Sequence, residues 1–195
     1  MPIVAIENPE IMTVSFRQTR QDKDYGSCLW ARFNFDTKNY HLSIESDCGS
    51  YGYGWCPTPD HETFLHLCSR FETGYLLDKI SARSVVDGDA THKSLIEWMK
   101  DYDSYGYNRL SCHDMQHIEE ACHANKNDHA VLRAIEEALE DTDFDGSVSD
   151  YDIACCIELT YPAGAKKIAQ IYHDHIQPEL QKLSGYKVKE KNNGE

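Results

Sequence analysis

The sequence lacks the features that mark several common classes of protein. No apolar run approaches the ~20 residues of a membrane-spanning helix, and the N-terminus lacks the basic-then-apolar order of a signal peptide. Lys and Arg are scarce, 19 against 33 Asp and Glu, and the net charge of −14 argues against binding to nucleic acid phosphates, which needs clustered cations. We therefore expect a cytoplasmic chain with no membrane segment and no direct contact with nucleic acid.

Motifs for nucleotide binding and nucleophilic catalysis are missing as well. The sequence contains no P-loop, no G-x-S-x-G elbow and no G-x-G-x-x-G turn, and we predict that the protein is not an enzyme. Its eight cysteines include no C-x-x-C pair, so the spacing predicts neither a zinc knuckle nor a thioredoxin-like redox centre. Asp47 stands beside Cys48, and a neighbouring carboxylate disfavours a reactive thiolate. We interpret the cysteines mostly as small, buried apolar residues in a reducing compartment.

The N-terminal part of the chain contains alternating apolar and polar residues. Runs at 12–18, 29–35, 42–46 and 51–55 have the period of half-buried strands. In the last run Tyr51, Tyr53 and Trp55 share one face and glycines occupy the other, so that a packed helix or a ligand has room to approach the glycine face closely. This part predicts an antiparallel sheet.

From Pro57 onward, apolar residues recur at helical spacing. Ser111 with Asp114 resembles a capping box, and Pro178 must kink or restart the last long helix. The predicted fold class is α+β, an N-terminal antiparallel sheet of three to five strands followed by a mostly helical C-terminal half. We predict a single domain over residues 1–186, with strands mainly in 1–56, helices mainly in 57–186 and a disordered tail over 187–195.

Residues 141–152 form the sharpest local pattern, which resembles the calcium-binding loop of an EF-hand. Carboxylates fall at loop positions 1, 3 and 5, glycine at position 6 and an acid at position 12. The last acid is Asp rather than Glu, and the loop occurs once, so an acidic turn leading into a strand over 152–159 is the alternative interpretation. We expect no cofactor, with calcium or magnesium as the alternative. The candidate metal ligands are Asp141, Asp143, Asp145, Ser147 and Asp152.

A second candidate metal site lies on one predicted helix. His113 and His117 are four residues apart, a spacing that lets two imidazoles share a transition metal, with Cys122 or Glu120 as further ligands. A metal hydrolase built on this pair is therefore a further alternative. The simpler interpretation, which we favour, is a surface helix that carries polar histidines.

The acidity is concentrated in one block of the sequence. Residues 111–160 carry 13 acidic and 2 basic side chains, a net of −11. Such a field steers association toward basic surfaces and can imitate a nucleic acid backbone, although a solvated acidic face that serves solubility is the alternative. Tyrosines in glycine-rich stretches favour a binding surface. The predicted partner-binding residues are Glu119, Glu120, Glu136, Glu137, Glu140, Tyr105 and Tyr107.

The run from Leu29 to Ile80 resembles an uncharacterised group of small proteins from tailed phages and prophages. Its most specific part is the pattern Ser-Asp-x-Gly-x-Tyr-x-Tyr-x-Trp over residues 46–55. Segments 161–162 and 177–180 look similar too. The resemblance carries over no functional residue. By analogy with accessory phage proteins, it implies an anti-defence inhibitor of a host complex, such as a nuclease or CRISPR effector, in the cytoplasm of an infected or prophage-bearing bacterium. The expected partner is a host protein with a basic, nucleic-acid-binding surface, and a homodimer is a further arrangement that we leave open.

Overall fold

The computed structural model describes residues 10–57, 63–140, 142, 144 and 148–185, and of residues 104 and 105 the backbone alone. The chain divides into two compact units, one from residues 1–82 and 163–195, the other from residues 83–162. We call them the sheet unit and the helical unit. The sequence predicted a single domain over residues 1–186, whereas the helices between residues 88 and 156 bury their apolar stripes in a core of their own.

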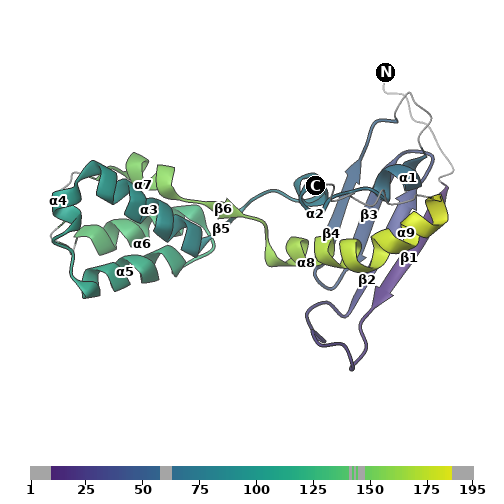
Figure 1. The fold of residues 1–195 in the computed structure, drawn as a ribbon, viewed down its shortest axis with the longest axis horizontal. Helices are drawn as coiled ribbons and strands as arrows, with labels where there is room; N and C mark the ends of the chain where they lie inside the picture. Colours follow the sequence, from purple (N-terminus) through teal and green to yellow (C-terminus); the bar gives the residue numbers. More distant parts are fainter. Residues whose placement is uncertain (1–9, 58–62, 141, 143, 145–147, 186–195) are drawn as a thin grey trace, which may run out of the picture. The chain divides into compact units, whose positions relative to one another are not determined.

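The sheet unit begins with four antiparallel strands in the order β1-β2-β3-β4 (Figure 1). Their bounds are β1 Ile11–Arg17, β2 Trp30–Asp36, β3 His41–Ser46 and β4 Gly49–Gly54. The alternation in the sequence sets the register, since Phe33 pairs with Ile44 and Phe35 with Leu42, and all four side chains are buried on one face. The N-terminal antiparallel sheet and the α+β class are therefore confirmed.

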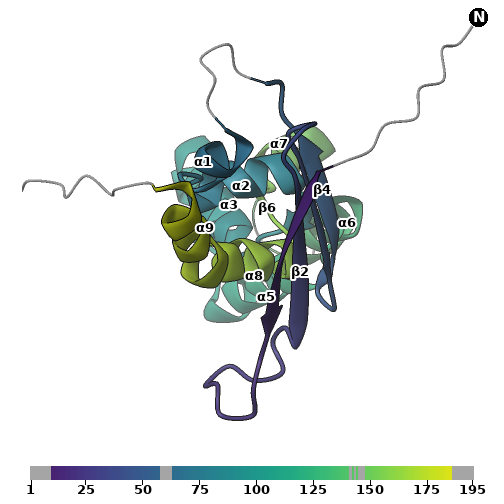
Figure 2. The ribbon, with the colours of Figure 1, turned by 90° about the vertical axis from the view of Figure 1, so that its right-hand side faces the viewer.

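Helices cover one face of this sheet (Figure 2). They are α1 Phe64–Cys68, α2 Thr73–Ile80, α8 Ala163–Ile171 and α9 Gln177–Ser184, and the π-helical segment η1, Tyr172–Ile176, joins the last two. Pro178 stands in the first turn of α9, which confirms that this proline restarts the helix. Tyr172 is 1% exposed, and its hydroxyl donates to the Cys68 carbonyl oxygen at 2.9 Å. This hydrogen bond from the buried side chain links η1 to the end of α1.

The turn between β3 and β4 is held by side chains of the phage-like motif. The Ser46 hydroxyl donates to the Gly49 carbonyl oxygen at 2.7 Å and accepts from the Cys48 N–H at 3.1 Å. Asp47 Oδ2 accepts the Leu29 N–H at 2.8 Å, which ties the turn to the segment before β2. Gly49 has a φ of +123°, which only glycine adopts without strain. The Ser-Asp-x-Gly part of the motif is therefore a turn signal.

The aromatic part of the motif faces the covering helices. The Trp55 indole N–H donates to the Tyr75 hydroxyl at 2.9 Å, and its ring stacks on Phe71 at 5.0 Å between centroids. On the other face, a Cβ built on Gly52 would lie 3.7 Å from ring atoms of His41. The helices therefore pack on the aromatic face, whereas the glycine face is exposed beside a histidine of the neighbouring strand.

The helical unit is inserted between α2 and α8. Its elements are β5 Val85–Val86, α3 Gly88–Tyr102, α4 Ser104–Tyr107, α5 Cys112–His123, α6 Asp128–Glu140, α7 Asp150–Cys156 and β6 Leu159–Thr160. β5 pairs antiparallel with β6, which brings the two ends of the unit side by side. Across both units, the described residues include no helix that is long and apolar enough to span a bilayer.

Caps define where the helices of this unit begin. Ser111 Oγ accepts the Asp114 N–H at 3.2 Å, and Asp114 Oδ2 accepts the Ser111 N–H at 2.7 Å, so the predicted capping box is confirmed. A second capping box joins Ser149 and Asp152 and starts α7. The alternative strand over 152–159 is therefore wrong for residues 152–156, which this cap directs into a helix, and within that range only Leu159 lies in a strand, β6.

The cysteines are all free thiols, and half of them are buried. Cys48 is half-buried, and the other three are exposed. The buried ones are Cys28, Cys68, Cys122 and Cys156. Burial raises the pKa of the Cys122 thiol to about 12, as befits a small core residue. The interpretation of the cysteines as apolar core residues thus applies to four of the eight.

Candidate functional site

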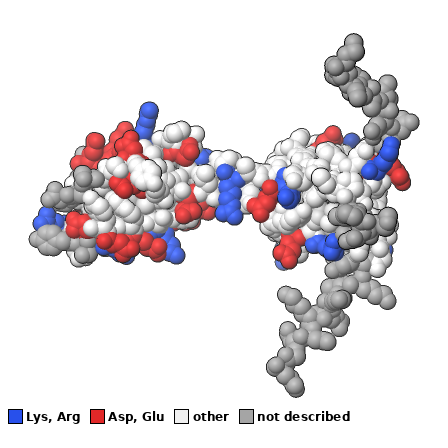
Figure 3. Space-filling view, turned by 90° about the horizontal axis from the view of Figure 1, so that it is seen from above, with Lys and Arg blue, Asp and Glu red and all other residues white. Residues whose placement is uncertain are grey.

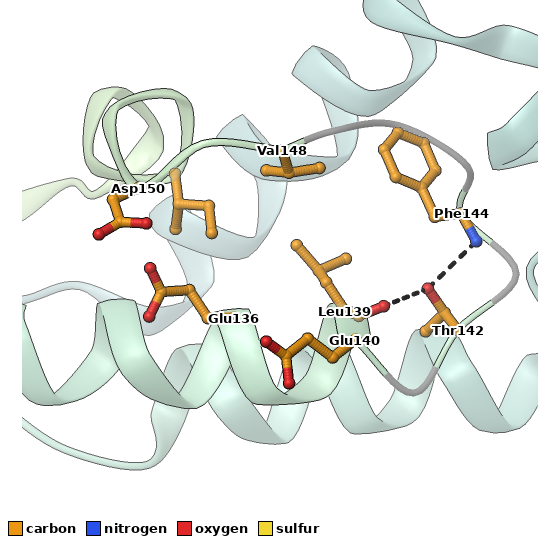
Figure 4. A pocket seen from close by; sticks show the side chains of 8 residues that line it. Glu136, Leu139, Glu140, Thr142, Phe144, Val148 and Asp150 are labelled. Atoms are coloured by element: carbon orange, nitrogen blue, oxygen red, sulfur yellow. Dashed lines mark hydrogen bonds between the residues drawn. The ribbon is translucent and has the colours of Figure 1, made fainter.

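An acidic pocket of about 450 Å³ lies between the end of α6 and the start of α7 (Figure 4). Glu136 and Glu140 come from α6, and Asp150 opens α7. In Figure 4 the carboxylates of Glu136 and Asp150 point toward each other. The pocket is lined by Glu136, Leu139, Glu140, Thr142, Phe144, Val148, Asp150 and Ile153.

Local hydrogen bonds shape the far end of this pocket. The Thr142 hydroxyl donates to the Leu139 carbonyl oxygen at 2.8 Å and accepts the Phe144 N–H at 3.2 Å. Phe144 is 7% exposed and therefore anchors this part of the chain in the core of the helical unit. Apolar side chains thus form the floor of the pocket, and the carboxylates lie at its rim.

The two facing carboxylates repel each other. A hydrogen bond with Asp150, burial and the negative charge of Asp150 raise the pKa of Glu136, and nearby Arg133 offsets only part of this. Glu136 therefore takes up a proton more readily than an isolated glutamate does. A cationic group from a partner would relieve the repulsion.

The glutamates of α5 border a different hollow. Glu119 and Glu120 are exposed, and the Glu120 carboxylate accepts a hydrogen bond from Gln116 at 2.8 Å. Their pocket, of about 860 Å³, is lined by His92, Leu110, Cys112, Met115, Gln116, Glu119, Glu120 and His123. The structure thus brings Glu136 and Glu140 together and places Glu119 and Glu120 at a separate pocket. Glu137 is exposed on α6 and lines neither pocket.

In the described part of the helical unit, the exposed tyrosines are two that the predicted partner-binding set did not include. The side chain of Tyr105 lies outside the described residues, and Tyr107 is half-buried with Lys100 Nζ 5.0 Å from its ring centre. By contrast, Tyr151 is 76% exposed and Tyr102 54% exposed. Helical spacing would have found Tyr151, because the buried positions of α7 are 153 and 156. In the sequence it directly follows Asp150, which lines the acidic pocket.

The predicted cation loop is described only in part. Asp141, Asp143, Asp145 and Ser147 lie outside the described residues. Asp152 Oδ2 accepts hydrogen bonds from the Ser149 N–H at 3.1 Å and the Ser149 hydroxyl at 2.6 Å, so its carboxylate serves as a cap. The loop is nevertheless flanked by two helices, α6 and α7, as an EF-hand requires.

The histidine pair on α5 has the predicted geometry but little around it. The rings of His113 and His117 are 4.2 Å apart between centroids, and both side chains are exposed. Within the part of the chain that the structure describes, no third His, Cys, Asp or Glu donor completes a metal-binding group there. This arrangement matches the simpler interpretation, a polar helix surface.

A further pocket lies in the sheet unit beside η1. It measures about 580 Å³ and is bordered by β1, by residues 18–24 and by α8 and η1. Its charges balance, because three basic and three acidic side chains line it, and Lys167 pairs with Asp24. The ring of His175 lies 5.0 Å from that of Phe16. This pocket is therefore close to neutral, in contrast to the acidic one.

Comparison with known proteins identifies a family. The family model Phage_phiTE_072, described as a phage family, matches residues 10–182 and so includes most of both units. Neither the curated proteins nor the solved structures gave a match. The phage origin implied by the resemblance is thus confirmed: the chain belongs to this phage family.

Proposed function

We propose that this phage protein binds a host protein complex through its helical unit and inhibits or redirects that complex. The observation that supports this is the segregation of charge. Residues 83–162 carry 18 acidic and 6 basic side chains, a net of −12 out of the −14 of the whole chain. On the face shown in Figure 3, Asp and Glu side chains gather over the helical unit.

Four glutamates of this unit are available to a partner. Glu119, Glu120, Glu137 and Glu140 are exposed. Among the described residues, no Lys or Arg forms a salt bridge with any of them. An exposed and unneutralised field of this kind attracts a basic surface from a distance and accelerates encounter.

The partner that fits is a host protein with a basic surface that normally holds nucleic acid. Carboxylates on two helices would occupy the positions of phosphates, and Tyr151 and Tyr102 would add buried aromatic contact. A host nuclease or a CRISPR effector, met in the cytoplasm of an infected or prophage-bearing bacterium, is the first class to test. The protein itself would not contact nucleic acid, because its own charge repels phosphates.

Competition with nucleic acid tests this proposal. Purified host nucleases and CRISPR effectors are bound to a labelled nucleic acid, and increasing amounts of the phage protein should displace it. Reversing Glu136, Glu137 and Glu140 to Lys should weaken displacement by at least tenfold at physiological salt. The matched control reverses Glu10, Glu72 and Glu179 in the sheet unit and changes the net charge equally, but should leave displacement unchanged. Equal loss in both variants, or none in either, would contradict the proposal.

A divalent-cation site in residues 141–152 is the second candidate function. The observation that favours it is the helix–loop–helix arrangement, with α6 ending at Glu140 and a capped α7 beginning at Asp150. Calorimetric titration with calcium and magnesium tests this site. EF-hand loops of sensors and of extracellular proteins bind calcium at or below about 1 mM, so binding should release or absorb heat in that range. A double variant, Asp143→Asn with Asp145→Asn, should abolish that heat. No heat in the unaltered protein removes the site.

A further inference from the structure

Two thiols and a carboxylate converge in the sheet unit, just before β2 and at the β3–β4 turn. The ligand atoms of Cys28, Asp47 and Cys48 all lie within 4.8 Å of one another. In the described part of the chain, this is the one group of three or more His, Cys, Asp or Glu donors with that property. The convergence depends on the fold, because Cys28 lies 19 residues before Asp47.

Hydrogen bonds orient the first two donors. Cys28 is 1% exposed, and its thiol donates to Asp47 Oδ1 at 3.2 Å. The other oxygen, Oδ2, accepts the Leu29 N–H at 2.8 Å. One carboxylate oxygen is thus fixed by the backbone while the other faces the thiol. Partners of this kind hold a ligand in position before a metal arrives.

The third donor is held just as closely. The Cys48 thiol donates to the Ser27 carbonyl oxygen at 3.2 Å, and the Cys48 carbonyl oxygen accepts the Tyr51 hydroxyl at 2.9 Å. A Cβ built on Gly164 would lie 2.3 Å from that same carbonyl oxygen, so the first turn of α8 packs directly against the turn. Cys48 is half-buried and Asp47 is exposed, which leaves one side of the group open to solvent.

We propose that Cys28, Asp47 and Cys48 form a site for a thiophilic divalent cation, Zn²⁺ by its chemistry. Two sulfur ligands and one carboxylate oxygen suit Zn²⁺, which prefers four ligands in a tetrahedron. The fourth ligand is a water from the open side. Binding releases the two thiol protons to solvent, so that two thiolates, one carboxylate and the cation together carry a net charge of −1.

Loss of the Cys28 proton is also what frees Asp47 to bind. The hydrogen bond from the thiol to Oδ1 disappears, and that oxygen gains a lone pair for the metal, while Oδ2 keeps the Leu29 N–H. Because the metal displaces the two thiol protons, affinity for the metal should fall as the pH falls.

Titration of the reduced full-length protein under anaerobic conditions tests this site. Co²⁺ serves as the spectroscopic probe for Zn²⁺, and we expect one equivalent to bind with a sulfur-to-cobalt charge-transfer band, then to be displaced by Zn²⁺. Cys48→Ser should lower the affinity by at least about 100-fold and Asp47→Asn by at least about tenfold. Cys56→Ser, an exposed cysteine in the same unit, is the matched control and should bind as the unaltered protein does.

Stability provides an independent measurement. Zn²⁺ should raise the unfolding temperature of the unaltered protein and of Cys56→Ser relative to chelator, and should leave Cys48→Ser unchanged. Circular dichroism checks that each variant folds. If Cys48→Ser does not fold, the comparison is made with Asp47→Asn instead. The proposal is overturned if no charge-transfer band forms, or if the Cys48 and Cys56 variants bind alike. It is equally overturned if mass spectrometry of the unreduced protein shows a Cys28–Cys48 disulfide and the reduced protein does not bind Zn²⁺.

Discussion

The sheet unit and the helical unit fill their interiors with different side chains. The core of the sheet unit is rich in aromatic rings, with Phe33 and Phe71 lying 5.8 and 6.3 Å from Tyr172 between ring centres. The fully buried large side chains of the helical unit are aliphatic. They are Leu95, Met99, Ile118, Ile135 and Ile153. Rings fill the wide space between a sheet and its covering helices, whereas branched aliphatic chains interlock between helices.

The two units differ more in net charge than in the side chains of their cores. The sheet unit carries 15 acidic and 13 basic side chains, a net of −2, and the helical unit a net of −12. The motif residues of the sheet unit are engaged in its own turn and core. Glu119, Glu120, Glu137 and Glu140 of the helical unit are exposed, and no Lys or Arg among the described residues forms a salt bridge with them. We infer that the sheet unit is the scaffold and the helical unit the binding module.

Removing a core side chain from one unit at a time gives the largest expected effect. Phe33→Ala should lower the free energy of unfolding of the sheet unit by about 3–5 kcal/mol, and Ile135→Ala that of the helical unit by about 2–5 kcal/mol, because each leaves a cavity. Hydrogen exchange followed by mass spectrometry measures protection in each unit separately. Each substitution should reduce protection mainly in its own unit, and uniform loss in both would contradict separate cores.

Two glycines offer a smaller and sharper comparison within the sheet unit. Gly164→Ala should destabilise by about 1–3 kcal/mol, because the new methyl group meets the Cys48 carbonyl oxygen. Gly74→Ala on α2 should stabilise by about 0.5–1 kcal/mol, because a Cβ there meets nothing within 4 Å and alanine favours the helix. Denaturant unfolding of both variants measures the difference in sign. The same sign in both would mean that α8 does not pack on the turn as described.

A helix cap in the helical unit should matter less than either core. Ser111→Ala removes the hydroxyl that accepts the Asp114 N–H and should lower the free energy of unfolding by about 1 kcal/mol. Ser15→Ala, at an exposed serine on β1, is the control and should change it by less than about 0.5 kcal/mol. Thermal denaturation of both variants measures the two losses of stability. A larger loss in Ser15→Ala than in Ser111→Ala would contradict the role of the cap.

Local patterns in the sequence predicted most of the elements correctly. Alternation gave all four strands of the sheet, and the capping box and Pro178 marked a helix start and restart. These features depend on hydrogen bonds and sterics between near neighbours, which the sequence displays directly. The same reasoning left a strand over 152–159 as an alternative because it overlooked Ser149 as a second cap.

What the sequence could not predict depends on long-range packing. The apolar stripes of the helices do not show which helices pack against each other, so the sequence did not predict the division into two units. Nor does spacing along the chain bring Cys28 beside Asp47, since that meeting depends on the β2–β3 register. The sequence shows the acidic block as a group, but only the fold separates Glu119 from Glu136.

The smallest expected effect is a difference in pH dependence between the units. In the sheet unit, hydrogen bonds from Asn39 lower the pKa of Asp36, so its stabilisation is lost as the pH falls through that lowered pKa. In the helical unit, the hydrogen bond with Asp150 raises the pKa of Glu136. Its contribution is present below the ordinary glutamate pKa and is lost as the pH rises through the raised one.

Glu136→Gln isolates this difference. The amide keeps a hydrogen-bond donor toward Asp150 and carries no charge, so the variant should match the unaltered protein at about pH 4 and exceed its unfolding temperature at about pH 8. Glu137→Gln removes the same charge from α6 without touching Asp150 and should show a smaller pH-dependent difference. Unfolding temperatures measured across this range for the three proteins decide it. If Glu136→Gln gains nothing at the higher pH, the facing carboxylates do not repel each other, and the acidic pocket loses its reason to attract a cationic partner.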